Sequence, residues 1–425
     1  MMEHVNNNLK NDTNQDEMRD KRWAIVSIAS IPLIMTLGNS MLIPVLPVME
    51  KKLDISKVQS SLIITVYSIV AIFLIPIAGY LSDRFGRKIV IIPSLILAGV
   101  GGVISAWAAW KMGNPYTIIL VGRILQGAGA AGAAPIVLPL VGDMFRRDKD
   151  VSATLGVIET SNTFGKVLSP ILGSFLAGFI WFLPFVSIPI FCLISVIAIF
   201  FLVKKPRNDK KGPDFKTFIK NTKEVFQQHS RWLFAVFVIG AILMFVLFAV
   251  LFYLSSVLED TYNFHGVKKG FILAIPLACL CLASFIAGKK IKDNMVLMKW
   301  ITFIGLILAG ASVLAVSISD QFIYLTIVFL ICGIGIGAGL PCLDALITQS
   351  IEKSVRGTIT SFYSSMRYIG VAAGPPVMAY FMKNNLMIMF IILAVCCLVA
   401  AVMAFVSIKP NKENEQEKNP VHSPV

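Results

Sequence analysis

The sequence predicts an all-α integral membrane protein in which twelve transmembrane helices form two pseudo-symmetric six-helix bundles. Three observations support this prediction: the apolar composition, the grouping of apolar residues into long blocks, and motifs that repeat at a constant offset. Of the 425 residues, 56% are hydrophobic and 15% are charged, whereas soluble domains carry about 25% charged residues. The mean hydropathy of +0.77 leaves too few polar residues to cover the surface of a soluble protein.

The apolar blocks have the length of membrane-spanning helices, which need about 20 mostly apolar residues. They fall into two sets of six. The first set covers residues 23–47, 58–81, 88–110, 116–142, 152–178 and 183–203. The second set covers residues 231–255, 267–288, 295–318, 321–347, 356–382 and 386–408. An even number of spans places both termini on the same side of the membrane.

The basic residues indicate which side that is. They are concentrated in the loops after spans 2, 4, 8 and 10 and in the central segment, as in Arg146, Arg147, Lys204 and Lys205. Because Lys and Arg are enriched in cytoplasmic loops, we expect cytoplasmic termini and a multi-pass protein of the cell membrane. This placement also accounts for the net charge of +14 without a nucleic-acid partner.

The spans and the charges together predict the domain organisation. We expect a disordered cytoplasmic tail, an N-terminal six-helix bundle, a cytoplasmic linker, a C-terminal six-helix bundle and a second cytoplasmic tail. These parts cover residues 1–20, 21–205, 206–229, 230–408 and 409–425. The linker is basic and has helical apolar spacing at Phe215, Phe218 and Ile219, which predicts a short amphipathic helix on the inner membrane surface.

Two glycine-rich motifs repeat in the same order and at nearly the same spacing. Residues 127–135 of span 4 correspond to residues 333–341 of span 10, at an offset of 206. Residues 165–170 of span 5 correspond to residues 370–375 of span 11, at an offset of 205. Small residues let transmembrane helices pack closely, which alone could explain such motifs. The constant offset favours duplicated halves around a central site near the membrane midplane.

The loop after span 2 reads Gly79-Tyr-Leu-Ser-Asp83-Arg84-Phe-Gly86-Arg87-Lys88. It resembles the major facilitator superfamily signature G-x-L-x-D-R-x-G-R-K at every fixed position. Arg123-Ile-Leu-Gln126-Gly127 in span 4 is similar to the R-x-x-Q-G motif of that family, and Pro44-Val-Leu-Pro47 resembles its drug:proton antiporter branch. The resemblance covers the membrane region and implies a secondary transporter that exchanges substrate for protons.

The loop motif has the composition of a conformational latch. Gly79 and Gly86 allow tight helix ends, and Asp83 can face the positive N-terminus of another helix. Arg84, Arg87 and Lys88 can pair with acids on the cytoplasmic face, with Asp143 at the end of span 4 as a candidate. For Arg87 and Lys88, a role only in membrane topology is an equal alternative.

Span 5 departs from the antiporter pattern G-x-x-x-G-P-x-x-G-G. Serine replaces glycine at Ser169 and Ser174, while Gly165, Pro170 and Gly173 remain. We expect a helix break at Pro170, because proline removes a backbone hydrogen bond. The intact copy of the motif, from Gly370 to Gly374 and Pro375, lies in span 11.

Six polar residues inside the spans are candidates for a central cavity. Glu159, Asn162 and Lys166 lie at i, i+3 and i+7 on one helical face. Arg123, Gln126 and Arg367 complete the set. Ionisable groups within spans are costly and mark functional sites or buried pairs. Glu159 is the predicted proton-coupling residue and Lys166 its neighbour, although a purely structural pair is the alternative. Asp344 is expected at a solvated helix end.

The resemblance to the antiporter branch implies a secondary transporter that exports a small lipophilic compound through alternating access, in exchange for protons, and we expect it to be a monomer. The alternatives are a carrier for an anionic metabolite or lipid headgroup, and a channel. The chain has no P-loop for a nucleotide and no nucleophile–base or metal cluster, so we expect neither enzyme activity nor a cofactor or metal. The seven cysteines all lie in apolar blocks, which favours buried thiols.

Overall fold

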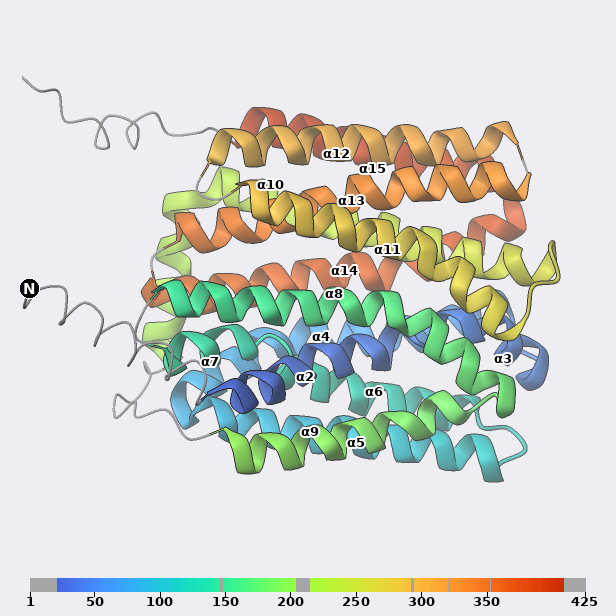
Figure 1. The fold of residues 1–425 in the computed structure, drawn as a ribbon, viewed down its shortest axis with the longest axis horizontal. Coiled ribbons are helices and arrows are strands. Elements are labelled where there is room, and N and C mark those ends of the chain that lie inside the picture. The colour runs from blue at the N-terminus through green and yellow to red at the C-terminus, as the bar shows by residue number, and fades with distance from the viewer. Residues whose placement is uncertain are drawn as a thin grey trace, which may run out of the picture.

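The computed structural model describes residues 21–145, 148–203, 215–291, 294–319, 321–351 and 353–408. Its helices run along the longest axis of the molecule and form a bundle in which some helices lie behind others (Figure 1). The first described residue, Lys21, and the last, Ile408, lie at the same end of the bundle, which we call the terminal face. The other end, with the loops at residues 54–56 and 261–265, is the opposite face.

The N-terminal half contains six helical segments of membrane-spanning length. The first combines α2 (Arg22–Ser40), η1 (Ile43–Val45) and α3 (Leu46–Leu53). It is followed by α4 (Lys57–Phe85), α5 (Arg87–Lys111), α6 (Tyr116–Ala133) with α7 (Val137–Met144), α8 (Asp148–Phe179) and α9 (Leu183–Leu202). Within the described residues, this half therefore contains the six spans predicted from the apolar blocks.

The C-terminal half repeats this arrangement. Its helices are α10 (Phe215–Asp260), α11 (Gly266–Ile291), α12 (Met295–Ala315) with η2 (Val316–Ile318), α13 (Phe322–Ser350), α14 (Lys353–Asn384) and α15 (Leu386–Ser407). Of the described helical segments, ten are long and apolar enough to cross a membrane by composition. The two that fall below that criterion are α8 and α14, which carry the polar residues singled out in spans 5 and 11.

Local sequence signals set the helix ends in the N-terminal half. Asp54 adopts a left-handed conformation, with a φ of 52°, and ends α3. Ser56 then starts α4 through a capping box with Gln59. Gly86, with a φ of 104°, is the single residue between α4 and α5. A side chain would be strained at that angle, so the motif glycine makes the abrupt turn between the two helices.

The repeated glycines mediate equivalent helix contacts in the two halves. A Cβ atom at Gly127 of α6 would overlap with the Tyr67 carbonyl of α4, and one at Gly333 of α13 would lie 2.5 Å from the Pro276 carbonyl of α11. The motifs in spans 5 and 11 pack in the same way. Gly165 of α8 faces α2, and Gly370 of α14 faces α10. The offset in sequence therefore corresponds to an offset in helix packing.

Two details differ from the sequence-based expectations. Pro170 and Pro375 do not break their helices: α8 and α14 continue through them. Proline still removes one hydrogen bond, so Pro170 leaves the Lys166 carbonyl without its helical donor. The predicted amphipathic helix is also not separate, because residues 215–230 are continuous with the seventh span in α10. Residues 206–214 of the predicted linker and both predicted tails, 1–20 and 409–425, lie outside the described residues.

Candidate functional site

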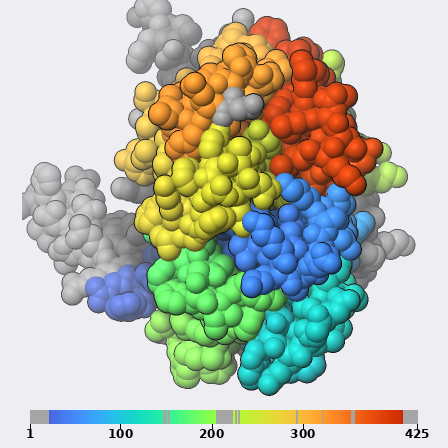
Figure 2. Space-filling view, turned by 90° about the vertical axis from the view of Figure 1, so that its right-hand side faces the viewer, coloured from blue at the N-terminus to red at the C-terminus, as the bar shows by residue number. Residues whose placement is uncertain are grey.

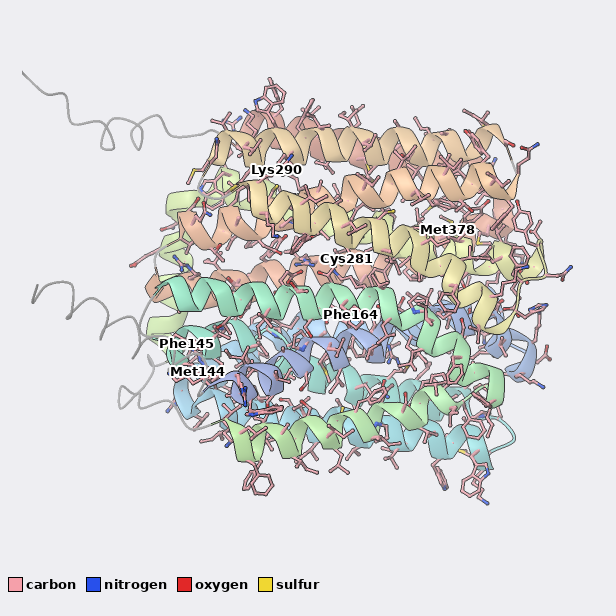
Figure 3. All side chains as sticks on the ribbon, in the orientation of Figure 1. Met144, Phe145, Phe164, Cys281, Lys290 and Met378 are labelled. Carbon is pink, nitrogen blue, oxygen red and sulfur yellow. The ribbon has the colours of Figure 1, made fainter. Side chains whose placement is uncertain are left out.

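The two halves meet along helices that include α8 and α14, which carry the repeated motif of spans 5 and 11. Helix α4 packs against α14, and α8 packs against α11. One polar bond crosses the first of these contacts: Thr65 Oγ1 donates to the Ala372 carbonyl at 2.8 Å. Close to the middle of the bundle, Phe164 of α8 and Cys281 of α11 lie at neighbouring positions along its length (Figure 3). The candidate site lies in this boundary between the halves.

A cavity with an empty volume of about 360 Å³ lies in the boundary. Its walls come from both halves: residues 40–44 and helix α8 on one side, and α10 and α11 on the other. Most of the lining is apolar, with Leu247, Phe248, Leu251, Leu273 and Leu277 from the C-terminal half. Lys166 is the one charged residue among the described residues that line it. The cavity therefore combines an apolar wall with a single positive charge.

The three polar residues predicted on one face of span 5 do lie along α8, but they make separate contacts. Asn162 accepts a hydrogen bond from Thr36 Oγ1 at 2.6 Å and contacts the Glu159 carboxylate at 3.5 Å. Lys166 lines the cavity one turn further along. The structure gives no ion pair between Glu159 and Lys166. A direct pair between them is therefore absent from this conformation.

Asp344 is not a solvated helix end, as the sequence suggested, but part of a charged pair. Its Oδ1 lies 3.4 Å from Arg367 Nη1, and the two side chains are about one-third and one-fifth exposed. The guanidinium of Arg367 also lies over the ring of Tyr363, 5.6 Å from its centroid. The charges of Asp344 and Arg367 interact with those of Glu159 and Lys166 on α8. The structure thus brings two acids and two bases together across the boundary.

Arg123 and Gln126 do not line this cavity, which corrects the sequence-based expectation. Arg123 is fully buried within the N-terminal half. Its guanidinium donates to Ile63 O at 2.8 Å, Gly38 O at 3.0 Å, Gln126 Oε1 at 2.5 Å and Asn39 Oδ1 at 2.6 Å. It also lies 4.5 Å from the ring centroid of Tyr67. Arginine's planar fork suits such multiple acceptors, so Arg123 connects α2, α4 and α6 rather than facing a ligand.

The charged motif between α4 and α5 forms a compact network at the terminal face. Arg87 pairs with Asp83 and, through Nε at 3.0 Å, with Asp143 at the end of α7. Arg84 Nη1 donates to Tyr80 Oη at 2.7 Å. Lys88 Nζ donates to two carbonyls at the end of α9, at 2.8 Å each. These bonds all lie within the N-terminal half.

The same motif faces the C-terminal half across a second hollow of about 270 Å³ of empty volume. Asp83 and Arg87 line it from one side, and Gly357, Thr358 and Ser361 near the start of α14 line it from the other. A Cβ atom at Gly79 would lie 2.9 Å from Ser361 Oγ. Asp83 thus lines the same hollow as the first turns of α14, while its ion pair is with Arg87.

At the opposite face, a group of charges joins the two halves, and sequence reasoning missed it. Lys269 is 1% exposed and Glu259 is 3% exposed, and their charged atoms lie 2.8 Å apart. Lys269 also donates to the Pro44 carbonyl at 2.8 Å, and Lys51 approaches Glu259 at 3.3 Å. Pro44 and Lys51 belong to the first span, whereas Glu259 and Lys269 belong to α10 and α11.

A second pair, Lys57 with Asp260 at 2.7 Å, lies next to this group but is exposed on both sides. Figure 2 shows the result: the region of α3 and the start of α4 meets the connection between α10 and α11, and this face has no visible opening. The sequence does place Glu259 just after one apolar block and Lys269 at the start of the next, which is the signal that could have predicted this pair. The predicted spans ended at 255 and began at 267, and so left Glu259 in a loop.

A metal centre has no support in the described parts of the chain, where no group of three or more His, Cys, Asp or Glu side chains could hold an ion. Of the seven cysteines, Cys192, Cys332, Cys342 and Cys397 are buried and all seven are free thiols.

Comparison with known proteins gives one family throughout the chain. A family model described as Major Facilitator Superfamily matches residues 28–375 and 298–425. The chain is 55% identical over 396 residues to the bacillibactin exporter of Bacillus subtilis, covering 93% of this chain and 98% of that protein. It is 24% identical over 367 residues to multidrug resistance protein 2 of the same organism, covering 84% and 88% of the two chains.

Solved structures share the fold at low sequence identity. The human organic anion transporter MFSD10 aligns with a TM-score of 0.72 and 16% identity, over 90% of this chain and 99% of that one. A bacterial homologue of the lysosomal transporter Spinster aligns with a TM-score of 0.73 and 14% identity, over 92% and 97% of the chains. At this level of identity the likeness establishes the arrangement of helices only.

Proposed function

The chain belongs to the Major Facilitator Superfamily, and from that premise we propose that it exports bacillibactin or a closely similar siderophore by alternating access. As a member of this family it is a multi-pass membrane transporter and not an enzyme. The observation that carries the substrate proposal is the 55% identity to a bacillibactin exporter over 98% of that protein's length. The distribution of Lys and Arg supports a terminal face in the cytoplasm of a cell-membrane protein, and we propose that the protein acts as a monomer.

The alternative is multidrug efflux, because several relatives carry that name at 23–26% identity. Such a protein would bind many lipophilic cations, which an acidic apolar pocket favours. In this chain the acids of the boundary have basic neighbours: Asp344 pairs with Arg367, and Lys166 lines the apolar cavity. This balance of charge supports a substrate with acidic groups over a lipophilic cation.

Export is tested directly in inside-out membrane vesicles that contain the protein. We expect acidification of the vesicle lumen to drive accumulation of bacillibactin several-fold above vesicles without the protein, and a protonophore to abolish it. Ethidium serves as the competing substrate. Accumulation of ethidium without any accumulation of bacillibactin would replace the siderophore proposal with multidrug efflux.

We propose that Glu159 is the acid that couples transport to protons. It lies within the bundle on α8, and its carboxylate contacts Asn162 and the Thr163 hydroxyl instead of a cation. It interacts electrostatically with Arg367 and Asp344 on the other half. A change in the distance between the halves therefore changes the charge environment of Glu159. Such a dependence is what proton coupling through a conformational change requires.

The variant Glu159→Gln is expected to lose transport driven by a pH difference and to retain exchange. The amide keeps the size and hydrogen-bonding capacity of the side chain but cannot take up and release a proton. The measurement is bacillibactin accumulation under a pH difference, compared with exchange of labelled for unlabelled bacillibactin without one. Glu224→Gln makes the same change on an exposed glutamate and should behave as wild type. Full gradient-driven accumulation by Glu159→Gln would rule out this assignment.

A further inference from the structure

The apolar cavity between the halves contains one charged residue among its described lining residues. Lys166 is the charged residue of a lining that is otherwise almost entirely apolar. An ionised side chain at this depth in a membrane protein is unfavourable unless it has a partner. We propose that the cavity binds the apolar part of an organic anion and that Lys166 binds its acidic group. This inference rests on the proposed transport function and specifies the ligand's chemical class and its anchor.

Lys166 is the available cation of the boundary. The structure gives it no hydrogen bond or ion pair with any described residue. The nearby acids have other contacts, since Asp344 lies 3.4 Å from Arg367 and Glu159 contacts Asn162 and Thr163. The ammonium therefore keeps its capacity to donate, and a ligand oxygen can accept from it inside the cavity.

The wall of the cavity defines the rest of the ligand. Leucine and phenylalanine side chains from α10 and α11 face residues of the first span and α8. The empty volume of about 360 Å³ includes space that is open to solvent, and the apolar lining suits an aromatic or aliphatic group. A cation of the same shape would be disfavoured by Lys166, because the two charges would repel one another in an apolar environment.

The ligand anchor and the proposed proton site occupy different positions. Glu159 does not belong to the lining of the cavity. It precedes Lys166 by seven residues, which corresponds to about 10 Å along a helix axis. Substrate and proton are thus coupled through the movement of the halves and not through direct contact at Lys166.

The cavity shares a residue with the buried charged group at the opposite face. Pro44 lines it, and the Pro44 carbonyl accepts the hydrogen bond from Lys269. A ligand at Lys166 would therefore share the cavity with a residue that this charged group holds in place. Release toward that face requires the Lys269 contact to open, which connects ligand binding with the conformational cycle.

The test compares three probes with one ring system and different charges: 1-naphthoate, 1-naphthalenemethanol and 1-naphthylmethylammonium. Their effect on the thermal stability of the purified protein is measured for wild type, Lys166→Met, Lys166→Arg and Lys290→Met. We expect naphthoate to raise the melting temperature of wild type the most and the ammonium probe the least. Lys166→Met should abolish this preference, Lys166→Arg should retain it, and the exposed Lys290→Met should match wild type.

Transport of bacillibactin by the same variants separates this inference from the proposed function. Loss of the preference for naphthoate in Lys166→Met, with the preference intact in Lys290→Met, supports the anchor whatever the natural substrate is. Wild-type protein that fails to transport bacillibactin but prefers naphthoate contradicts the siderophore proposal alone. An unchanged preference for naphthoate in Lys166→Met, or no preference in wild type, overturns the anchor even if bacillibactin is transported.

Discussion

Replacing Glu259 with glutamine is expected to open the opposite face of the protein. Glu259 is the acid that neutralises the buried Lys269 at 2.8 Å, and both side chains are at most 3% exposed. Removing one charge of such a pair leaves the other buried without compensation, at a cost of about 3 kcal/mol or more. That cost applies to the closed arrangement, in which Lys269 is buried against Pro44. A change of this size shifts the ratio of open to closed molecules by about 100-fold.

The shift is measured with a cysteine at Ser255, which is buried and donates a hydrogen bond to the Ile43 carbonyl at 2.9 Å. Alkylation of this cysteine by a maleimide should be slow in the parent protein and much faster with Glu259→Gln. Asp260→Asn is the matched control, because the Lys57–Asp260 pair next to it is exposed. Exposed pairs contribute at most about 1 kcal/mol. Equal alkylation rates in the Glu259 and Asp260 variants would show that the buried pair does not hold this face closed.

Much of the fold was predictable because membrane-spanning helices follow from local composition. Apart from α10, which begins at Phe215 and not at 231, the spans in the structure begin and end within a few residues of the apolar blocks. The single-residue turn at Gly86 follows from its motif. The repeated glycines also predicted close packing. Only the structure shows which residues these glycines contact, such as Tyr67 for Gly127 and Ala241 for Gly370. Small residues in a sequence indicate that a close contact exists but not which helix provides it.

The site was less predictable because its residues come from distant parts of the chain. Helical spacing placed Glu159, Asn162 and Lys166 on one face but could not give their partners. Arg123 resembled a cavity residue because it is charged and lies within a span. Two of its four acceptors are backbone carbonyls, which a sequence does not distinguish. Asp344 was predicted to be solvated because it lies near the inner end of a predicted span. Its position in the sequence gave no sign of the contact with Arg367.

The second prediction with a large effect concerns the packing of α8 against the first span. Gly173→Ala is expected to destabilise the protein by about 1–3 kcal/mol, the range typical of overpacked sites. A Cβ atom there would overlap with the carbonyl oxygen of Met41 and lie 2.8 Å from its Cγ. The backbone of Met41 cannot move away without displacing Ser40, Ile43 and Pro44, which line the cavity. The same variant should therefore also weaken binding in the cavity.

The control for this prediction is Gly156→Ala in the same helix, where a Cβ atom would meet no other atom within 4 Å. Alanine favours a helix over glycine by about 1 kcal/mol, so Gly156→Ala should be neutral or stabilising. Propensity alone would make Gly173→Ala stabilising by a similar amount, and the two variants thus separate helix propensity from helix packing. The measurement is the melting temperature of the purified protein in detergent. A melting temperature for Gly173→Ala at or above that of Gly156→Ala would mean that α8 does not need this close approach to hold the cavity wall in place.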